Sequence, residues 1–512
     1  MESRKTINFS FKIIVIMLSF LGITLVLIAT SRYGIGLSPD SIGYISTARN
    51  LGTGNGFLLY DGNPTVLCPP LYPAILALTY KTFGFDPLNS ARVINAIIFG
   101  LIVYLSGFLI LRYVDNSLLF MLVGILFILF SKPLFSVSVM AWTEPLFILF
   151  VLLFLISLEF YMEKGNKTSL GLLSASVALA FLTRYIGVTL ILSTVIIILF
   201  LHNQSTKNKL IHLFLFGIVS TLPFSIWAIR NFTLTGTLFG TYAPSMSSYY
   251  ENLYLTLRTF FFWLFPHRIT EHRSILMIFS VIVGYLVGIS WGNNWLKLKS
   301  LIMHTGPLII FTTVYTIFLI YSSTTTAIDP IDDRLLSPIY IPVIIIILSI
   351  VQSIVKPFKE HHSEKSVNGF LVIIFSIWLI YPLKGIISEA KNLFNHGVGY
   401  NTILWKDSEV IKYLSQHPLE KNKFVYSNAP DALYILTGLS AKFSPSKTYY
   451  RSTKLKDSMS TWPITSTAYL IWFDNKHRDY LYTIEELKSI CNIFQIVKLD
   501  DGSIYTISQK PK

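Results

Sequence analysis

Long runs of apolar residues alternate with short polar loops over residues 1–390. Most runs are close to the ~20 residues that a helix needs to cross the hydrocarbon core of a bilayer, so the pattern predicts a polytopic membrane protein. The two shortest runs lie on either side of Arg184. We expect about eleven transmembrane helices, at residues 12–30, 92–111, 118–137, 142–161, 169–183, 185–201, 210–229, 274–292, 301–321, 336–355 and 367–384.

Basic residues lie in every second loop of this arrangement, and the positive-inside rule assigns those loops to the cytoplasm. They are Arg4, Lys5, Lys12, Arg112, Lys164, Lys167, Lys207, Lys209, Lys297, Lys299, Lys356, Lys359 and Lys365. The N-terminus is therefore expected in the cytoplasm of the cell, with the first apolar run as an uncleaved signal anchor in the cell membrane. The outward segments are then Arg184, the loops 31–91, 140–143, 230–273 and 322–335, and the C-terminal region.

One apolar stretch, 253–265, is too short to span a bilayer. Trp263 and the flanking Arg258, His267 and Arg268 favour a helix that lies in the outer membrane interface. Counting this stretch as a span would move Lys297 and Lys299 to the outside, against the charge pattern of all the other loops.

From about residue 400 the pattern becomes that of a soluble domain. Residues 494–508 are typical of a β-hairpin with Asp501-Gly502 at its turn. The other segments predict helices at 407–417, 430–438 and 483–494, and strands at 423–428 and 468–474. We therefore expect two domains: a transmembrane domain over 1–390, with a first outer loop at 31–91, and a small extracytoplasmic α/β domain over 400–512.

Composition agrees with the membrane class. Hydrophobic residues make up 53% of the chain and charged residues 13%, with a mean hydropathy of +0.58, whereas soluble domains carry about twice that charged share. The net charge of +14 does not indicate nucleic-acid binding, because many basic residues lie in loops where they determine topology. Cys68 and Cys491 are the only cysteines, which excludes a disulfide framework and a CxxC metal site but leaves one bridge between them open.

The first outer loop, 31–91, is too polar and too rich in Gly and Pro to lie inside a bilayer. Its first half predicts a capped helix, with Ser38 as N-cap, Pro39 at the first helical position and Gly52 near the end. Asp40 then lies in the first turn, where the helix dipole favours a carboxylate. Two interpretations stay open: Asp40 stabilises a helix start, or it acts on a substrate.

Three more ionisable residues are expected at the outer membrane boundary, where charges are costly and often functional. Glu144 starts one span, Arg184 separates two, and Arg334 precedes another. Together with Asp40 they suit a phosphate-bearing substrate and a group that must lose a proton. Simpler interpretations remain: Glu144 as an N-terminal helix acid, Arg184 as a snorkelling side chain, and Arg334 paired locally with Asp329 or Asp332.

Four motifs carry a family resemblance: PDSIGYISTARNLGTGNGF, CPPLYP, MAWTEPLF and DDRLLSPIYIP. Their order resembles GT-C glycosyltransferases, in the branch of the protein O-mannosyltransferases (family 39) and the lipid A aminoarabinose transferases. The resemblance implies an all-α polytopic fold and transfer of a sugar from a polyprenyl-phosphate donor to an acceptor hydroxyl at the outer membrane face. The acceptor could be a protein, a lipid or a glycan. A single displacement would invert the anomeric centre.

The resemblance also implies roles for individual residues. Asp40 takes the place of the catalytic base or acceptor-orienting acid, and Glu144 that of the second acid. Some relatives place a phosphate-binding Lys just before the PPL motif, where this chain has Leu67-Cys68. Binding of the donor phosphate would then fall to other groups: Arg184 and Arg334, with Tyr72 and Arg230 as further candidates. No cofactor is required, and a divalent metal ion at the carboxylates stays open.

Three other functions compete with this one. A transporter or flippase for an anionic or lipid-linked substrate usually places its charges near the midplane and shows repeated halves; here the charges lie at the outer edge and no repeat is visible. A polysaccharide polymerase or ligase would usually carry its large loop late in the chain. A membrane scaffold would not need recurring acids and arginines at one face.

Overall fold

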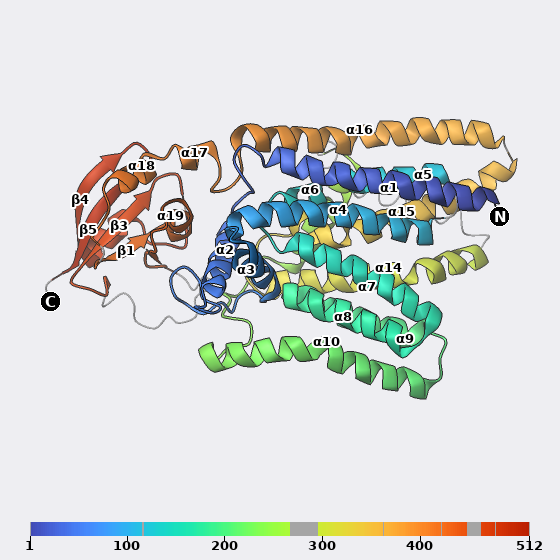
Figure 1. Ribbon diagram of the computed structural model, residues 1–512, viewed down its shortest axis with the longest axis horizontal. Coiled ribbons are helices and arrows are strands. Elements are labelled where there is room, and N and C mark those ends of the chain that lie inside the picture. Colours follow the sequence, from blue (N-terminus) through green and yellow to red (C-terminus); the bar gives the residue numbers. More distant parts are fainter. Residues whose placement is uncertain are drawn as a thin grey trace.

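The computed structural model is a bundle of long helices with a small α/β domain at one end (Figure 1). We call the end of the bundle next to this domain the domain end. It describes residues 2–114, 117–266, 295–361, 363–420, 422–447, 462–476 and 478–510. The predicted span 274–292 lies outside the described residues, as do His267 and Arg268 of the predicted interfacial stretch.

Eight helices of the described residues are long and apolar enough to cross a membrane. The predicted spans 169–183 and 185–201 coincide with two shorter elements, α8 (Lys167–Thr183) and the 3₁₀ turn η1 (Tyr185–Gly187) followed by α9 (Val188–Phe200). The long ones are α1 (Glu2–Ala29), α4 (Pro87–Tyr113), α5 with α6 (Leu118–Leu129, Lys132–Ser138), α7 (Glu144–Lys164), α10 (Thr206–Thr235), α14 (Trp295–Thr325), α15 (Asp333–His361) and α16 (Glu364–His396). This multi-pass arrangement confirms the predicted membrane class.

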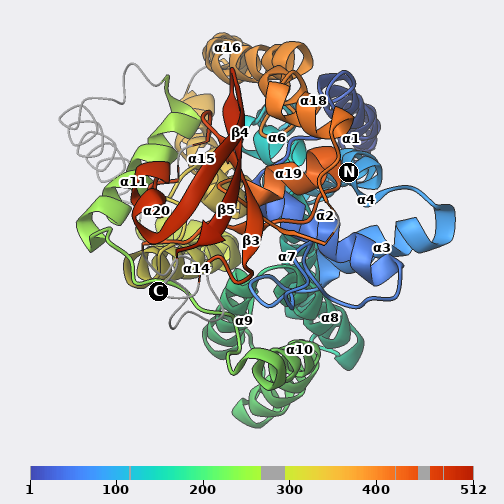
Figure 2. The ribbon, with the colours of Figure 1, turned by 90° about the vertical axis from the view of Figure 1, so that its left-hand side faces the viewer.

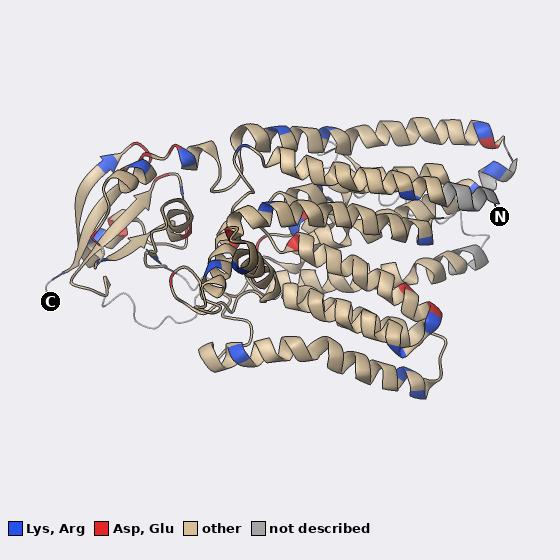
Figure 3. Ribbon diagram, viewed as in Figure 1, with Lys and Arg blue, Asp and Glu red and all other residues tan. Residues whose placement is uncertain are grey.

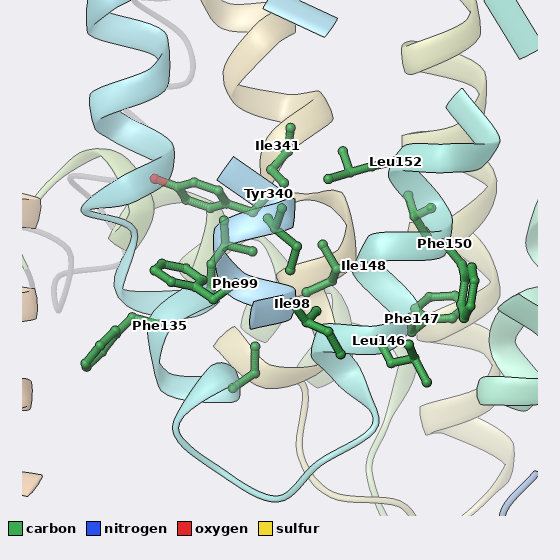
Figure 4. Packing of buried hydrophobic residues seen from close by; sticks show 14 of the residues in the cluster. Ile98, Phe99, Phe135, Leu146, Phe147, Ile148, Phe150, Leu152, Tyr340 and Ile341 are labelled. Atoms are coloured by element: carbon green, nitrogen blue, oxygen red, sulfur yellow. The ribbon is translucent and has the colours of Figure 1, made fainter. Parts of the chain in front are cut away.

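Close packing of backbones holds the bundle together, because lipid offers no hydrophobic drive for helices to associate. Gly100 and Gly107 let α4 approach α1: a Cβ at these positions would lie 2.5 Å from Ile23 and 2.7 Å from Val15. In the bundle centre, buried aromatic and aliphatic side chains from α4, α6, α7 and α15 fill the space between helices, among them Phe99, Phe135, Phe147 and Tyr340 (Figure 4). This packed core holds helices α4, α6, α7 and α15 together (Figure 4).

Three shorter helices lie near the domain end. The first outer loop forms α2 (Pro39–Gly52) and α3 (Leu71–Phe83), and the predicted interfacial stretch forms α11 (Tyr249–Leu264). The α11 helix packs on α14 and α15, and its Trp263 Nε1 donates to Asp333 Oδ1 at 2.9 Å.

The C-terminal domain is built on a five-stranded sheet of order β2-β1-β3-β5-β4. Its β1 is parallel to both β2 and β3, and β5 is antiparallel to β3 and β4. Helix α19 packs against α2 of the first loop (Figure 2). The elements are α17 (Ile403–Lys406), α18 (Glu409–Gln416), β1 (Phe424–Ser427), α19 (Pro430–Thr437), β2 (Lys442–Phe443), β3 (Thr467–Phe473), α20 (Ile484–Ile490), β4 (Cys491–Leu499) and β5 (Gly502–Gln509).

The α/β class is confirmed, but one predicted helix is too long. The helix predicted over 483–494 ends at Ile490, and Cys491 already begins β4 in an extended conformation. The reason is pairing: Cys491 lies opposite Gln509 of β5, so residues 491–494 gain a ladder of hydrogen bonds that the local sequence does not reveal. No disulfide joins Cys68 and Cys491, so the bridge left open by the sequence does not form.

The segments predicted to face outward all meet at the domain end. They are the described residues of the loops 31–91, 140–143, 230–273 and 322–335, together with Arg184 and the C-terminal region (Figure 1). Lysines and arginines occupy the loops at the opposite end of the bundle (Figure 3). Loops that the sequence predicts on opposite sides of the membrane therefore lie at opposite ends of the bundle (Figure 1, Figure 3).

Candidate functional site

The helix that carries Asp40 starts as the sequence predicts. Ser38 is the N-cap of α2 and forms a capping box with Ser41, while Pro39 occupies the first turn. These contacts place Asp40 beside backbone N–H groups that have no partner within the helix, where a carboxylate is stabilised. The side chain of Asp40 keeps 24% of its surface exposed.

Arg334 binds three carboxylates that come from different parts of the chain. Together with Arg184, which binds one of them, these residues form what we call the charge cluster. Its Nη2 donates to Asp40 Oδ2 at 2.7 Å, its Nε to Glu144 Oε1 at 2.6 Å and its Nη1 to Asp329 Oδ2 at 3.1 Å. Its side chain is 13% exposed. Charge-assisted bonds in such a shielded place are strong, so Arg334 determines where these acids lie.

The start of α15 holds Arg334 in place. Asp332 Oδ1 accepts hydrogen bonds from the backbone N–H groups of Arg334 (2.9 Å) and Leu335 (3.2 Å). Burial raises the pKa of the Asp332 carboxyl above its usual value. The sequence left Asp329 and Asp332 open as local partners of Arg334; Asp329 binds the guanidinium, whereas Asp332 binds the backbone.

Glu144 is the buried centre of the cluster. Its side chain is 1% exposed and lies between two guanidiniums, with Arg184 Nη1 at 2.7 Å and Arg334 Nε at 2.6 Å from Oε1. Arg184 Nη1 also donates to Thr143 Oγ1 at 2.9 Å. A carboxylate at this depth is stable only when its charge is matched, and the two arginines match it.

Trp142 contacts both Arg334 and Ser38, the N-cap of the helix that carries Asp40. The sequence analysis did not assign it a role. The Arg334 guanidinium carbon lies 4.0 Å from the centre of the indole ring, a cation–π contact. The indole Nε1 donates to Ser38 Oγ at 2.7 Å, at the cap of the helix that carries Asp40. The one signal in the sequence is its position directly before Thr143-Glu144.

Tyr72 belongs to a buried hydrogen-bond network that reaches the turn before Glu144. Its side chain has no exposed surface, and its hydroxyl donates to Asn95 Oδ1 at 3.2 Å. Asn95 Nδ2 in turn donates to the carbonyl of Met140 at 2.7 Å. Tyr72 therefore supports the turn that precedes Glu144.

Arg230 holds the second half of the first loop. Its Nη1 donates to the carbonyl of Thr65 at 2.7 Å and its Nη2 to that of Phe57 at 3.1 Å. Its guanidinium stacks 4.6 Å from the ring centre of Trp227. Within the described residues no carboxylate forms an ion pair with Arg230, in contrast to Arg184 and Arg334.

A hydroxyl group connects the Arg230 region to the charge cluster. Tyr185 follows Arg184 in the chain, and its hydroxyl donates to the carbonyl of Val66 at 2.6 Å. Trp227 Nε1 donates to the same hydroxyl at 3.3 Å. Residues 65 and 66, shortly before the CPPLYP motif, are thus held by Arg230 and by Tyr185, the residue after Arg184.

The carboxylates of the cluster share one guanidinium instead of facing one another. Among the described residues no group of three or more His, Cys, Asp or Glu side chains is arranged to hold a metal ion. What the arrangement offers chemically is one partly exposed carboxylate, Asp40, fixed in direction by an arginine, and one carboxylate, Glu144, buried by two.

A family model described as dolichyl-phosphate-mannose-protein mannosyltransferase matches residues 68–227. The matched region includes Tyr72, Glu144 and Arg184, and lies between Asp40 and Arg230. No curated protein matches the sequence.

Solved structures resemble the chain over almost its whole length. Crystal structures of ArnT from Cupriavidus metallidurans, in the apo state and bound to undecaprenyl phosphate, both have a TM-score of 0.59. They are 11% and 12% identical, and each alignment covers 96% of this chain and 97% of ArnT. The archaeal oligosaccharyltransferase AglB from Archaeoglobus fulgidus, in complex with an inhibitory peptide and a dolichol-phosphate, has a TM-score of 0.50 at 11% identity, covering 91% of this chain and 69% of AglB.

Proposed function

We propose, from the premise that this chain has the GT-C glycosyltransferase fold, that it is a membrane glycosyltransferase that uses a polyprenyl-phosphate-linked sugar. The observation that carries the proposal is the cluster of Asp40, Glu144, Arg184 and Arg334 at the domain end of a multi-pass bundle. The undecaprenyl phosphate in one ArnT structure and the dolichol-phosphate in the AglB structure support a lipid-phosphate donor.

Asp40 is the catalytic base in this mechanism. The acceptor hydroxyl oxygen forms a bond to the anomeric carbon while the bond from that carbon to the phosphate oxygen breaks. The hydroxyl proton passes to the Asp40 carboxylate, and polyprenyl phosphate leaves as an anion. Attack opposite to the leaving group inverts the anomeric centre. Asp40 suits the role better than Glu144 because it is 24% exposed, against 1% for Glu144.

Glu144, Arg184 and Arg334 act as a positioning group. The Nε, Nη1 and Nη2 atoms of Arg334 each donate to a carboxylate, and Arg184 Nη1 binds Glu144. Their charges therefore stabilise the acids and hold Asp40 in one direction, which is a large part of the catalytic advantage of a fixed site. This assignment differs from the sequence-based expectation that these two arginines bind the donor phosphate.

The donor phosphate binds at Arg230 in our proposal. The guanidinium has no carboxylate partner among the described residues, and it lies against the 57–65 segment just before Leu67-Cys68. Relatives that carry a Lys before PPL supply a positive charge from that segment. Here Arg230 supplies it from α10. A charge-assisted hydrogen bond to the leaving phosphate would favour departure of the anion.

Replacing Arg230 by Gln tests this assignment. Gln keeps a polar amide but is two atoms shorter than Arg, so the positive charge and the reach of Nη1 and Nη2 are both lost. We expect the KM for the lipid donor to rise about 10-fold or more, because hydrogen bonds to charged groups contribute about 1.5–3 kcal/mol. Steady-state kinetics with varied donor measure the effect. Arg32→Ala removes an exposed charge at the same end and is the control. An unchanged KM in R230Q would contradict the assignment.

The domain end faces outward from the cell in this proposal, with the N-terminus in the cytoplasm and the C-terminal domain extracytoplasmic. The lysines and arginines in the loops of the opposite end support this orientation (Figure 3). The acceptor is a protein, a lipid or a glycan that reaches the site from that side.

The function is tested with purified protein in lipid nanodiscs and a panel of polyprenyl-phosphate sugars. Release of polyprenyl phosphate with at least one donor, in the presence of extracted envelope lipids, glycans or peptides as acceptors, is the expected result. No release with any donor, together with substrate flux in proteoliposomes, would favour the transporter instead.

A further inference from the structure

Three segments that are far apart in the sequence pair through their backbones at the domain end. The Gly36 N–H donates to the Val139 carbonyl at 2.8 Å, and the Ala141 N–H donates to the Gly36 carbonyl at 2.9 Å. The Tyr400 N–H donates to the Leu37 carbonyl at 2.9 Å. We call the segments 35–37, 139–141 and 398–401 the backbone junction.

The two glycines of the backbone junction leave no room for a Cβ. A Cβ on Gly36 would lie 2.2 Å from Met140 Sδ and 2.4 Å from Val398 Cγ1. A Cβ on Gly399 would lie 1.7 Å from the Leu37 carbonyl oxygen, and Gly399 has a φ of +62°. Glycine is required at position 399 because the two backbones touch and φ is positive, whereas at position 36 the side chains of Met140 and Val398 fill the space that a Cβ would need.

The segment 398–401 is fixed from both sides. On the bundle side, Asn401 Nδ2 donates to the Ile35 carbonyl at 2.6 Å. On the domain side, the Tyr400 hydroxyl donates to Asp431 Oδ2 at 2.6 Å, and Asp431 pairs with Arg478 at 2.7 Å. The Asp431 and Arg478 side chains are 3% and 6% exposed. The C-terminal domain thus holds this segment through a buried ion pair.

The backbone junction lies immediately before both carboxylates of the proposed site. Leu37 precedes Ser38, the N-cap of the helix that carries Asp40. Ala141 precedes Trp142 and is three residues from Glu144. A displacement of Gly399 would therefore reach Asp40 through a few rigid peptide units.

We infer that the segment 398–401, anchored in the C-terminal domain, positions Asp40 for the transfer reaction. This inference rests on the proposed function. It gives the C-terminal domain a role in catalysis: Tyr400 and Asn401 are positioning residues that act through the backbone of Leu37. The domain has a second contact with the first loop, where the Tyr434 ring stacks on Tyr60 with 5.2 Å between ring centres. Tyr434 also lies 5.6 Å from the Arg49 guanidinium, in the last turn of α2 and thus at the opposite end from its N-cap.

Gly399→Ala tests the inference, with Gly438→Ala as the matched control. Both glycines have positive φ, +62° and +75°, but a Cβ on Gly438 meets nothing within 4 Å. We expect Gly399→Ala to lower kcat about 10- to 100-fold, as for a small misplacement of a catalytic group, with the donor KM within a few-fold of wild type. Gly438→Ala should keep wild-type kcat. Asn401→Ala, which removes one side-chain bond, should give a smaller loss of kcat if Gly399→Ala does not fold.

Amide hydrogen exchange of the peptides that cover residues 36–45 supplies a measurement independent of activity. Exchange there should become faster in Gly399→Ala or Asn401→Ala and stay unchanged in Gly438→Ala. Wild-type protein without transfer to any acceptor would overturn the proposed function while leaving this exchange result intact. An active wild type, with unchanged kcat and exchange in both Gly399→Ala and Asn401→Ala, would overturn the positioning role.

Discussion

Asp40→Asn is expected to lower kcat for sugar transfer by about 10²- to 10⁴-fold, the usual range for the loss of a positioned general base. The amide oxygen of Asn can still accept the hydrogen bond from Arg334 Nη2, so the cluster should keep its geometry. The variant loses the ability to take the acceptor proton. Release of polyprenyl phosphate, measured with saturating donor and acceptor, reports the change.

Asp86→Asn is the matched control for this prediction. Asp86 lies in the same loop and also pairs with an arginine, Arg49, at 2.9 Å, with 38% of its side chain exposed. It caps α4 and takes no part in the charge cluster. Its variant should retain kcat within a few-fold of wild type. If Asp40→Asn transferred sugar at the wild-type rate while remaining folded, Asp40 would not be the base.

Glu144→Gln is expected to destabilise the protein by about 3–5 kcal/mol, the usual cost of removing one partner from a buried ion pair. Glu144 is the carboxylate partner of Arg184, whose side chain is 19% exposed. Without Glu144 the two guanidiniums of Arg184 and Arg334 would face each other with less compensation. The thermal inactivation rate in nanodiscs measures the loss, since membrane proteins of this size seldom unfold reversibly.

The double variant Glu144→Gln/Arg184→Gln separates charge balance from positioning. Removing both charges should restore part of the stability, because coupled residues do not behave additively. Activity should stay low, because Arg334 loses the carboxylate that holds its Nε. Additive losses in the double variant would show that Glu144 and Arg184 do not stabilise each other. A fully active double variant would remove Glu144 from the positioning group.

The membrane spans and the alternation of loops were predictable because both depend on local properties. A run of apolar residues is recognised within one helix, and the basic loops repeat with every second span. The start of α2 was predictable for the same reason, since Ser38 and Pro39 act within a single turn. The predicted end of the helix at 483–494 was wrong because Cys491 pairs with Gln509 of β5. Local helix preference contains no information about such pairing between separate segments.

The candidate residues of the site were predictable, but their partners were not. Charged residues at the membrane boundary are costly and often functional. For that reason Asp40, Glu144, Arg184 and Arg334 could each be selected from the sequence. That Arg334 bonds to carboxylates from three loops, and that Trp142 stacks on it, depends on distances between helices.

The order of polar and apolar residues was thus sufficient for the class of protein, the alternation of its loops and the residues worth testing. It could not reveal that Arg230 has no carboxylate partner among the described residues, or that Gly399 touches Leu37. Ion pairs and backbone contacts join residues hundreds of positions apart, and their strength depends on burial and direction, which arise when the helices pack. The roles that we propose for these residues therefore depend on the assembled bundle and its C-terminal domain.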